Sequence, residues 1–337
     1  MRICCAKRET STWSLFDRDE HALATLDAQG IATRRVDSAD TSALCQALLG
    51  FDALVNAHYL AIGVASAARW AGVHYFDLTE DVRATHAIRA IAEDSVQAFM
   101  PQCGLAPGFI GIVAHDLATR LDDLREVKMR VGALPEFSTN ALKYNLTWSI
   151  DGLINEYCQP CEAICEGHTQ WVQPLEGVEH FSLDGIEYDA FNTSGGLGTL
   201  CEMLAEKVET LDYKSVRYPG HREGLKTMLR RAVPSTAQDV VLIFVTVTGM
   251  RHGQLVQDVF MRKIFAKQVC GMPMSAIQIT TAGAICAELD LFREGVLPQS
   301  GFVRQEQVPL AVFLDNRFGK LYEGASAAVS EHALAAA

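Results

Sequence analysis

Short apolar runs alternate with helix-like stretches over the first third of the chain. Strands are predicted at residues 13–17, 32–37, 52–57, 74–78 and 97–101, each followed by a helix, at residues 21–28, 41–49, 62–70, 82–93 and 109–121. This alternation is typical of a parallel sheet flanked by helices. It predicts an α/β fold with a Rossmann-type doubly wound parallel sheet, in which ligands bind beyond the carboxyl ends of the strands.

From Glu126 onward the pattern changes to longer segments in which apolar and polar residues alternate. The clearest segments are residues 126–134, 168–174, 179–191 and 239–250, and a helical pattern returns over residues 275–293. Alternation with a period of two predicts an antiparallel sheet that has one face covered by helices. We therefore expect a second domain of the α+β type.

The turn that binds phosphate in such folds is not visible near the start of the sequence. A Rossmann-type domain begins with a strand, a G-x-G-x-x-G turn and a helix whose N-terminus receives the pyrophosphate. Here no glycine precedes Gly30. Asp17 ends a predicted strand, as does the carboxylate that binds the ribose in such folds, but only sixteen residues precede it. Either the first strand and the glycine turn are missing, or the fold differs and begins with the strand at residues 13–17. We favour the first explanation, because the later periodicity matches well, and we expect no settled strand in residues 1–12.

The composition is that of a globular protein with room for two domains. The chain has 337 residues, of which 49% are hydrophobic and 21% are charged. Its formal charge is −12 and no run of Lys or Arg exceeds a pair, so nucleic acid is not expected as a partner. No apolar stretch approaches the roughly 18 residues of a membrane span, and no signal peptide opens the chain. We therefore expect no membrane association and a cytoplasmic location.

Ten cysteines are scattered along the chain, and one group of them is tightly spaced. Cys158, Cys161 and Cys165 form a C-x-x-C-x-x-x-C run, which is one way for a zinc or iron–sulfur site to begin. A closed site needs four ligands, and no second C-x-x-C or pair of histidines follows. We therefore expect reduced thiols and no metal.

Several unusual strings of residues occur in order along the chain. They are DRD (17–19), VNAHY (55–59), HYFDLT (74–79), CGLAPGF (103–109), VGALP (131–135), NALKYNLTWS (140–149), INEY (154–157), AFNTSGGLGTL (190–200), YKSVRYPGH (213–221), SAIQITTAGAI (275–285) and GFVRQE (301–306). Together they resemble the saccharopine dehydrogenase family, and lysine 6-dehydrogenases most closely, over roughly residues 13–323.

The resemblance implies an oxidoreductase that uses NAD or NADP to act on a CH–NH bond of lysine or of a lysine-derived amino acid. The leading reaction is oxidative deamination at the ε-carbon of lysine. The resemblance also implies a homodimer and a last segment that folds back onto the nucleotide domain. We therefore expect residues 1–125 and about 270–330 to form the nucleotide-binding domain, and residues 126–269 to form a substrate-binding and dimerisation domain.

Four residues near the ends of early strands are candidates for cofactor binding. Asp17 would accept hydrogen bonds from the ribose hydroxyls, which favours NAD because a carboxylate repels the 2′-phosphate of NADP; the neighbouring Arg18 acts against that preference. Asn56 and Ala57 end a buried strand, where a small residue lets a cofactor pass close by. A surface turn and ordinary strand-end packing are the alternative explanations.

The segment from Cys103 to Phe109 is the strongest candidate for contact with the nicotinamide. A strand stops before Gly104, Pro107 and Gly108 set a rigid turn, and a helix follows. The start of that helix is expected to present free N–H groups toward the cofactor. The alternative is a plain turn between strand and helix, and the reaction does not need Cys103 as a nucleophile.

An amino-acid substrate needs a cation for its carboxylate and a group that handles one proton. Arg217 is our candidate for the cation, because a planar guanidinium binds a carboxylate in two places. His221 is expected to titrate near neutral pH as an acid or base. Further candidates are Lys143 and Tyr144 for proton handling or carboxylate contact, Trp148 as an apolar wall, and Thr193 in a loop that closes over the substrate. A structural role is an equal alternative for Lys143, Tyr144 and His221.

Two other functions fit the same residues. Saccharopine cleavage or reduction would need a second cation for the extra carboxylate. A catalytically silent homologue, retained as a dimeric structural or binding protein, would explain the missing glycine turn. The shape of the pocket decides the substrate, and distant segments set that shape.

Overall fold

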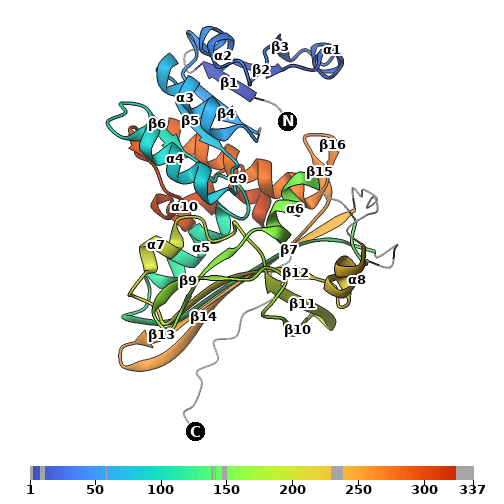
Figure 1. The fold of residues 1–337 in the computed structure, drawn as a ribbon, viewed down its shortest axis with the longest axis vertical. Coiled ribbons are helices and arrows are strands. Elements are labelled where there is room, and N and C mark those ends of the chain that lie inside the picture. Colours follow the sequence, from blue (N-terminus) through green and yellow to red (C-terminus); the bar gives the residue numbers. More distant parts are fainter. Residues whose placement is uncertain are drawn as a thin grey trace.

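A seven-stranded sheet lies at one end of the molecule and an eight-stranded sheet lies at the other (Figure 1). The computed structural model describes residues 3–7, 12–57, 59–137, 140, 142–145, 150–228 and 238–323. In spatial order, the first sheet contains β17 (Gly301–Phe302), β6 (Ala98–Met100), β5 (His74–Asp77), β4 (Ala53–Asn56), β1 (Ile3–Lys7), β2 (Thr12–Asp17) and β3 (Ala32–Arg35). All neighbouring pairs that exclude β1 are parallel, which confirms the predicted Rossmann-type α/β class.

The helices of this sheet start and end close to the predicted positions. They are α1 (Glu20–Asp27), α2 (Thr41–Leu48), α3 (Ala61–Ala71), α4 (Val82–Ala92) and α5 (Phe109–Ala118). The carboxylates of Asp19, Asp40 and Asp81 accept hydrogen bonds from backbone N–H groups in the first turns of α1, α2 and α4. These caps satisfy donors that have no partner inside the helix, and they explain where the three helices begin.

The first-strand position of the sheet is filled by β1, contrary to our expectation for residues 1–12. β1 pairs with β2 on one side and with β4 on the other, and it is antiparallel to both. A Rossmann-type sheet has a parallel strand here, followed by the glycine turn, whereas no glycine lies between β1 and β2. The facing edges of β2 and β4 carry backbone groups that need hydrogen-bond partners, and the segment ICCAK supplies them.

The second sheet is built from long strands. It contains β10 (Glu179–Leu183), β11 (Ile186–Asn192), β12 (Thr210–Arg217), β7 (Asp123–Pro135), β13 (Asp239–Arg251) and β14 (Gln254–Phe265) in that order, with β8 (Cys161–Cys165) beside β12 and β9 (His168–Val172) beside β8. β15 (Lys267–Val269) and β16 (Met272–Met274) form a separate hairpin. The remaining helices are α6 (Ile150–Cys158), α7 (Leu200–Leu204), α8 (His221–Met228), α9 (Ala276–Arg293) and α10 (Leu310–Asp315), with short 3-10 turns η1 (Gln305–Gln307) and η2 (Gly319–Tyr322).

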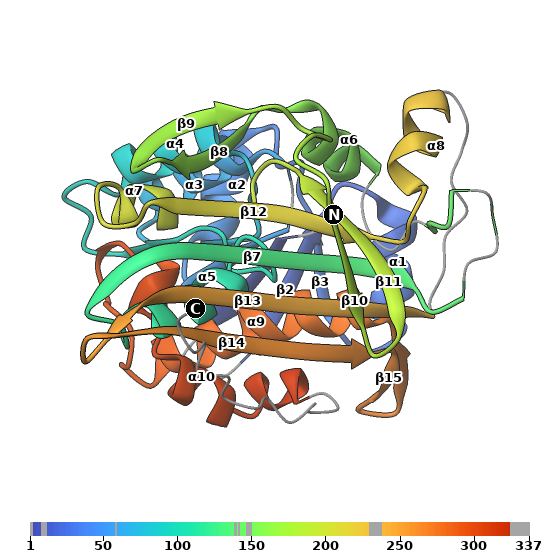
Figure 2. The same ribbon diagram turned by 90° about the horizontal axis from the view of Figure 1, so that it is seen from below.

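The second sheet is mixed, and the expectation of a purely antiparallel sheet was wrong. β12 runs parallel to β7, whereas the other neighbours are antiparallel. Alternation along one strand shows which side chains share a face, but it does not show the direction of the neighbouring strand. Figure 2 looks onto β12, β7, β13 and β14, with α5 and α9 behind them.

Helices α5 and α9 connect the two sheets through one apolar core. The largest buried cluster includes Phe76 and Met100 of the first sheet and Met129 and Val245 of the second, together with residues of both helices. After α9 the chain returns to the first sheet, where β17 pairs with β6. The exact boundaries of the two domains stay a prediction. Within the described ranges, no helix is both long and apolar enough to cross a membrane.

Candidate functional site

A hydrogen-bonded group of buried side chains joins the carboxyl ends of β4 and β5. The Tyr75 hydroxyl donates to Asp77 Oδ2 (2.7 Å) and accepts from Asn56 Nδ2 (3.2 Å). Asp77 Oδ1 accepts from the backbone N–H groups of Thr79 and Gln102, each at 3.0 Å, so it also fixes the exit of β6. Burial raises the pKa of Asp77 to about 6, although these hydrogen bonds counter the shift.

The Cys103–Phe109 turn is tightly closed, and the expectation of free N–H groups at its end was wrong. The N–H of Phe109 donates to Gly104 O (2.9 Å), and the N–H of Ile110 donates to Leu105 O (3.0 Å). Cys103, Pro107, Gly108 and Phe109 are all buried. Because the turn uses the first donors of α5 internally, a ligand cannot recruit them without opening it.

The loop at residues 193–198 of the second domain touches the strand ends of the first. Gly195 has φ +89°, and an added Cβ would lie 2.9 Å from the backbone oxygen of Glu80. At Gly198 an added Cβ would lie 3.2 Å from Gln102 Oε1. Glycine at these positions therefore lets the loop approach the ends of β5 and β6 at backbone distance.

Glu80 is the carboxyl group at this junction. It follows β5 and is partly buried, and burial raises its pKa to about 8. The carboxylate of Glu156, on α6 of the other domain, adds to the shift by repulsion, as does Asp81. A carboxyl group that gains or loses a proton near neutral pH is suited to acid or base chemistry.

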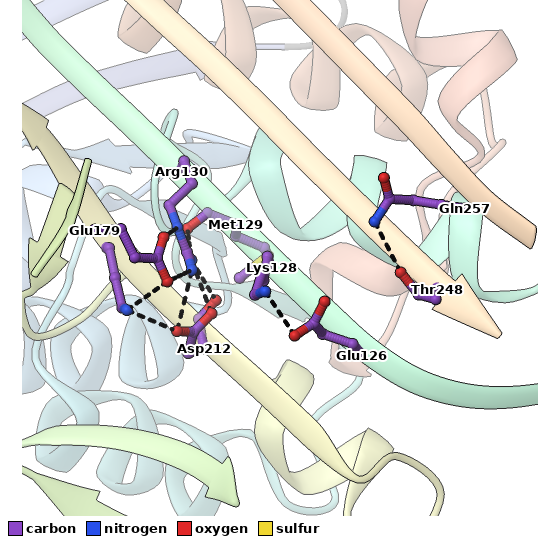
Figure 3. Close-up of polar contacts among 9 residues, drawn as sticks. Glu126, Lys128, Met129, Arg130, Glu179, Asp212, Thr248 and Gln257 are labelled. Carbon is purple, nitrogen blue, oxygen red and sulfur yellow. Dashed lines mark hydrogen bonds and ion pairs between the residues drawn. The ribbon is translucent and has the colours of Figure 1, made fainter. Parts of the chain in front are cut away.

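Alternation along β12 separates two polar groups. Tyr213, Ser215 and Arg217 lie on the face toward α6 and the loop at residues 193–198. Asp212 and Lys214 lie on the opposite face. There Arg130 of β7 binds Glu179 and Asp212, with 2.8 Å from Nη2 to Glu179 Oε1 and 2.8 Å from Nη1 to Asp212 Oδ1 (Figure 3). Lys214 joins the same carboxylates. This second group is a satisfied ionic network of the sheet and is separate from the site.

Ser215 connects the loop to the acidic residue of α6. Its hydroxyl donates to Glu156 Oε1, and its oxygen lies 2.8 Å from Thr193 Oγ1. Because Ser215 uses its proton on Glu156, Thr193 is the donor in the second bond. The next residue, Ser194, donates its backbone N–H to Glu156 O (3.0 Å). Thr193 therefore lies in the polar site, as a structural contact of the loop.

Arg217, Tyr157 and His221 form a chain of hydrogen bonds with a defined direction. Arg217 Nε donates to the Tyr157 hydroxyl (2.7 Å), which lies 3.2 Å from His221 Nε2. His221 Nδ1 lies 2.9 Å from Leu142 O, which can only accept, so the proton of the ring is on Nδ1 and Nε2 accepts from Tyr157. Arg217 also binds Val216 O (2.8 Å) and pairs with Glu156 (3.5 Å).

The expectation that His221 titrates near neutral pH was wrong. Its side chain is fully buried, and burial together with the nearby Arg217 charge lowers its pKa to about 4. His221 is therefore neutral at pH 7. Arg217 is also almost fully buried and has partners, so the geometry favours a role in holding Tyr157 and Glu156. Its direct capture of a substrate carboxylate stays a prediction.

The structure brings together only some of the other predicted substrate residues. The Tyr144 ring is buried and lies 5.0 Å from the Arg217 guanidinium, and it also contacts His221. Lys143, directly before Tyr144 in the chain, is exposed to solvent. Trp148 lies outside the described residues. Tyr144 therefore belongs to the polar site through its ring, whereas nothing places Lys143 there.

The residues predicted for the adenosine end lie apart from this site. Asp17 ends β2, and its carboxylate accepts from the N–H of Asp19 (3.0 Å). Arg18 lines a cavity of about 760 Å³ with Arg34, Arg35 and the carboxylates of Asp19, Asp37 and Asp40. The cavity therefore has balanced charge. Ala57 is half-buried at the end of β4.

The tight cysteine group is spread over two elements. Cys158 is exposed at the end of α6, Cys161 is buried at the start of β8, and Cys165 is half-buried at the end of β8. Burial raises the pKa of Cys161 to about 12, which keeps its thiol protonated. In the part of the chain that the structure describes, no group of His, Cys, Asp and Glu side chains is arranged to hold a metal ion.

Sequence reasoning missed five residues of the site. Asp77, Glu80, Glu156, Tyr157 and Ser215 were not among the candidates, although Asp77 lies near the end of a predicted parallel strand and Glu80 follows that strand. The rule that ligands bind at the carboxyl ends of strands could have found Asp77 and Glu80. Glu156, Tyr157 and Ser215 gave no such signal, because only the folded second domain brings them together.

The fold and site define a two-domain protein with a Rossmann-type sheet whose strand ends face a polar group on a second, mixed sheet. Residues 104–232 match the family described as Saccharopine dehydrogenase C-terminal domain. This match covers the segment from the end of the first sheet to α8, and most of the chain is similar in fold to saccharopine dehydrogenase.

Two solved structures support this fold. The apo histidine-tagged saccharopine dehydrogenase (L-Glu forming) from Saccharomyces cerevisiae is similar with a TM-score of 0.73 and 14% identity, covering 91% of this chain and 92% of that one. The homospermidine synthase from Legionella pneumophila, in complex with NAD, is similar with a TM-score of 0.66 and 14% identity, covering 92% and 83%. At these identities the likeness shows the fold.

Proposed function

We propose that this chain is an oxidoreductase that uses NAD or NADP to oxidise a carbon–nitrogen bond of lysine or a lysine-derived amino acid. The reaction removes a hydride from carbon and a proton from nitrogen, and the resulting imine is hydrolysed by water. A bound nicotinamide supplies the hydride acceptor. The chain must then bind the amine, orient it and accept the proton.

One observation carries this proposal: the strand ends of the Rossmann-type sheet meet a buried polar group of the second domain. Glu80 and Gln102 contact the loop at residues 193–198, and the loop continues through Thr193 to Ser215 and Glu156. Ligands of parallel α/β sheets bind at such strand ends. The junction therefore combines a cofactor position with polar groups suited to an amino-acid substrate.

The residues of this chain fit the cofactor incompletely. At the nicotinamide end, Asn56, Ala57 and the Cys103–Phe109 turn would border the ring, and Ala57 offers a small side chain at a strand end. At the pyrophosphate end the fit fails, because antiparallel β1 stands where a parallel strand, a glycine turn and a helix N-terminus would bind the phosphates. We expect NAD or NADP to bind weakly for this reason.

Glu80 is our candidate for the group that accepts the proton. It lies at the domain junction, and a pKa of about 8 is close to that of an efficient base near neutral pH. The neutral His221 stays in place as an acceptor for Tyr157 and has no need to titrate. Arg217 would hold Tyr157 and Glu156 in position.

NAD remains our preferred cofactor. Asp17 ends β2 where the adenosine ribose would lie, and a carboxylate there repels a 2′-phosphate. The arginines of the adjacent cavity are offset by an equal number of aspartates. The homodimer and the cytoplasmic location are proposals that rest on the resemblance and on composition.

Calorimetric titration with NAD and NADP tests the cofactor assignment. We expect NAD to bind more tightly than NADP, and exchange of Asp17 for Ala (D17A) to reduce that difference. Asp27→Ala, at the far end of the following helix α1 and away from the proposed ribose position, is the matched control and should leave the difference unchanged. Tighter binding of NADP by the unmodified chain would contradict the assignment.

The position of β1 favours a second candidate function. A sheet without the glycine turn is expected of a catalytically silent homologue, which would keep the two-domain fold for a structural or binding role. Binding of neither NAD nor NADP, with the chain folded, would support this candidate over the first.

A further inference from the structure

A buried carboxyl group on α9 has no part in the site described above. Glu288 is 0% exposed, and neither of its carboxyl oxygens has a hydrogen-bond partner among the described residues. Gln305 of η1 is also buried, and its Oε1 has no partner in the same part of the chain. A buried acceptor without a partner is costly, so its retention in a fold requires an explanation.

Glu288 lies against the Cys103–Phe109 turn. The Cys103 thiol faces Glu288, and this thiol donates to Met100 O (3.0 Å) at the end of β6. Gln305 Nε2 donates to Pro101 O (2.6 Å) and lies 4.0 Å from Cys103 Sγ. Glu288 and Gln305 therefore approach the start of the turn together.

The surroundings of Glu288 cannot stabilise a negative charge. The titratable groups that face it are the Cys103 thiol from the turn and the Tyr322 hydroxyl from η2, and neither is a cation. Glu288 forms no ion pair with any Lys, Arg or His of the described ranges. Burial accordingly raises its pKa to about 8, and the Cys103 thiol counters this only in part.

We propose that Glu288 is a positioning residue, which supports the Cys103–Phe109 turn through its side-chain contact with Cys103. Phe109, at the end of the turn, packs on Tyr322 with ring centroids 4.0 Å apart, so the same C-terminal elements hold both ends of the turn. Ionisation of Glu288 places an unpaired charge in this apolar contact and loosens the turn. This inference rests on the proposed function in one respect, which is that the turn lies beside the bound cofactor.

The first test compares Glu288→Gln with the unmodified chain by thermal unfolding between pH 5.5 and pH 8. Glutamine keeps the shape but cannot ionise, so the midpoint of the variant should rise relative to that of the unmodified chain as the pH increases. Asp290→Asn is the matched control on the same helix: Asp290 is paired with Arg317, which lowers its pKa, so its difference should stay flat. A flat difference for Glu288→Gln, or a variant that fails to fold, overturns the proposal.

The second test measures backbone hydrogen exchange, corrected for the intrinsic pH dependence, in peptides that cover the turn. In the unmodified chain, protection of the turn should fall by about tenfold or more relative to β13 between pH 6 and pH 9, whereas Glu288→Gln should keep it. Equal loss in both proteins overturns the positioning role, even if Glu288 titrates as expected. Neither test measures activity, so each can fail independently of the proposed enzyme function.

Discussion

Glu80 stands where two physical requirements meet at a single residue. Its backbone must lie close to Gly195 of the other domain, and its side chain must lose water to Glu156 and the protein interior. Burial, together with repulsion by Glu156 and Asp81, raises the cost of a carboxylate, which is why the pKa of Glu80 lies above the ordinary value. Asp77, deeper in the fold, has three hydrogen bonds that offset much of the same cost.

Exchange of Glu80 for Gln should lower kcat for amine oxidation by about 100-fold or more, because a positioned base contributes about 10²–10⁴-fold. A base works when it is deprotonated, so the rate of the unmodified enzyme should rise with pH through about 8. Initial rates across the pH range measure both effects. Asp81→Asn is the control: it keeps the cap of α4, removes a repelling charge and should move the rise to lower pH. Unchanged kcat in Glu80→Gln would exclude Glu80 as the base.

The loop at residues 193–198 contacts the first sheet through the close approach of Gly195 to Glu80. Gly195→Ala should destabilise the fold by about 1–2 kcal/mol for the left-handed backbone and by a further 1–3 kcal/mol, roughly, for displacing Glu80. Gly185 has φ +76° and open space around an added Cβ, so Gly185→Ala should show the backbone strain alone. Denaturant unfolding of both measures the difference, and equal losses would contradict the contact.

Helix α9 begins at two different caps, and they should differ in strength. Ser275 is the N-cap residue directly before the helix. Asp239, on β13, accepts hydrogen bonds from the N–H groups of Ala276 and Ile277. Asp239→Ala should cost about 3 kcal/mol, because it removes hydrogen bonds to a charged group at a buried helix start. Ser275→Ala should cost about 1 kcal/mol. A smaller loss for Asp239→Ala in chemical unfolding would refute this ranking.

The same elements show how far the sequence predicts this molecule. Helices α1, α2 and α4 could be placed because their Asp caps and apolar periods are local signals. The antiparallel β1 could not, because nothing in a five-residue strand states the direction in which it fills a gap. The parallel pairing of β7 with β12 was missed for the same reason.

The candidate site was predicted less completely than the fold. Arg217, Tyr144, His221 and Thr193 do come together, but their partners Glu156 and Ser215 carry ordinary polar patterns in separate elements. The neutral state of His221 follows from burial, which depends on tertiary packing. A sequence motif can therefore name a residue of the site without giving its charge.

For the whole molecule, the titration of buried groups predicts a loss of stability between pH 6.5 and pH 8. Glu80 and Glu288 have folded-state pKa values of about 8, above their ordinary values, so over this range the unfolded chain binds fewer protons than the folded one. Below pH 6.5 the lowered pKa of His221 acts in the opposite direction, since charging that residue favours the unfolded chain. The midpoint of thermal unfolding should therefore fall as the pH rises from 6.5 to 8. A midpoint that rises over this interval would contradict the assignment of these buried acids.

We propose that this two-domain fold transfers hydride from a lysine-type amine to a nicotinamide cofactor. Amine-dependent reduction of NAD tests it most directly, with lysine and saccharopine as substrates, the Glu80→Gln variant as control and the cofactor at high concentration because the pyrophosphate end fits poorly. The proposal predicts reduction with at least one of the two substrates, and its loss in the variant. No reduction with either substrate, in a chain shown to be folded, would contradict the proposal and favour a silent homologue.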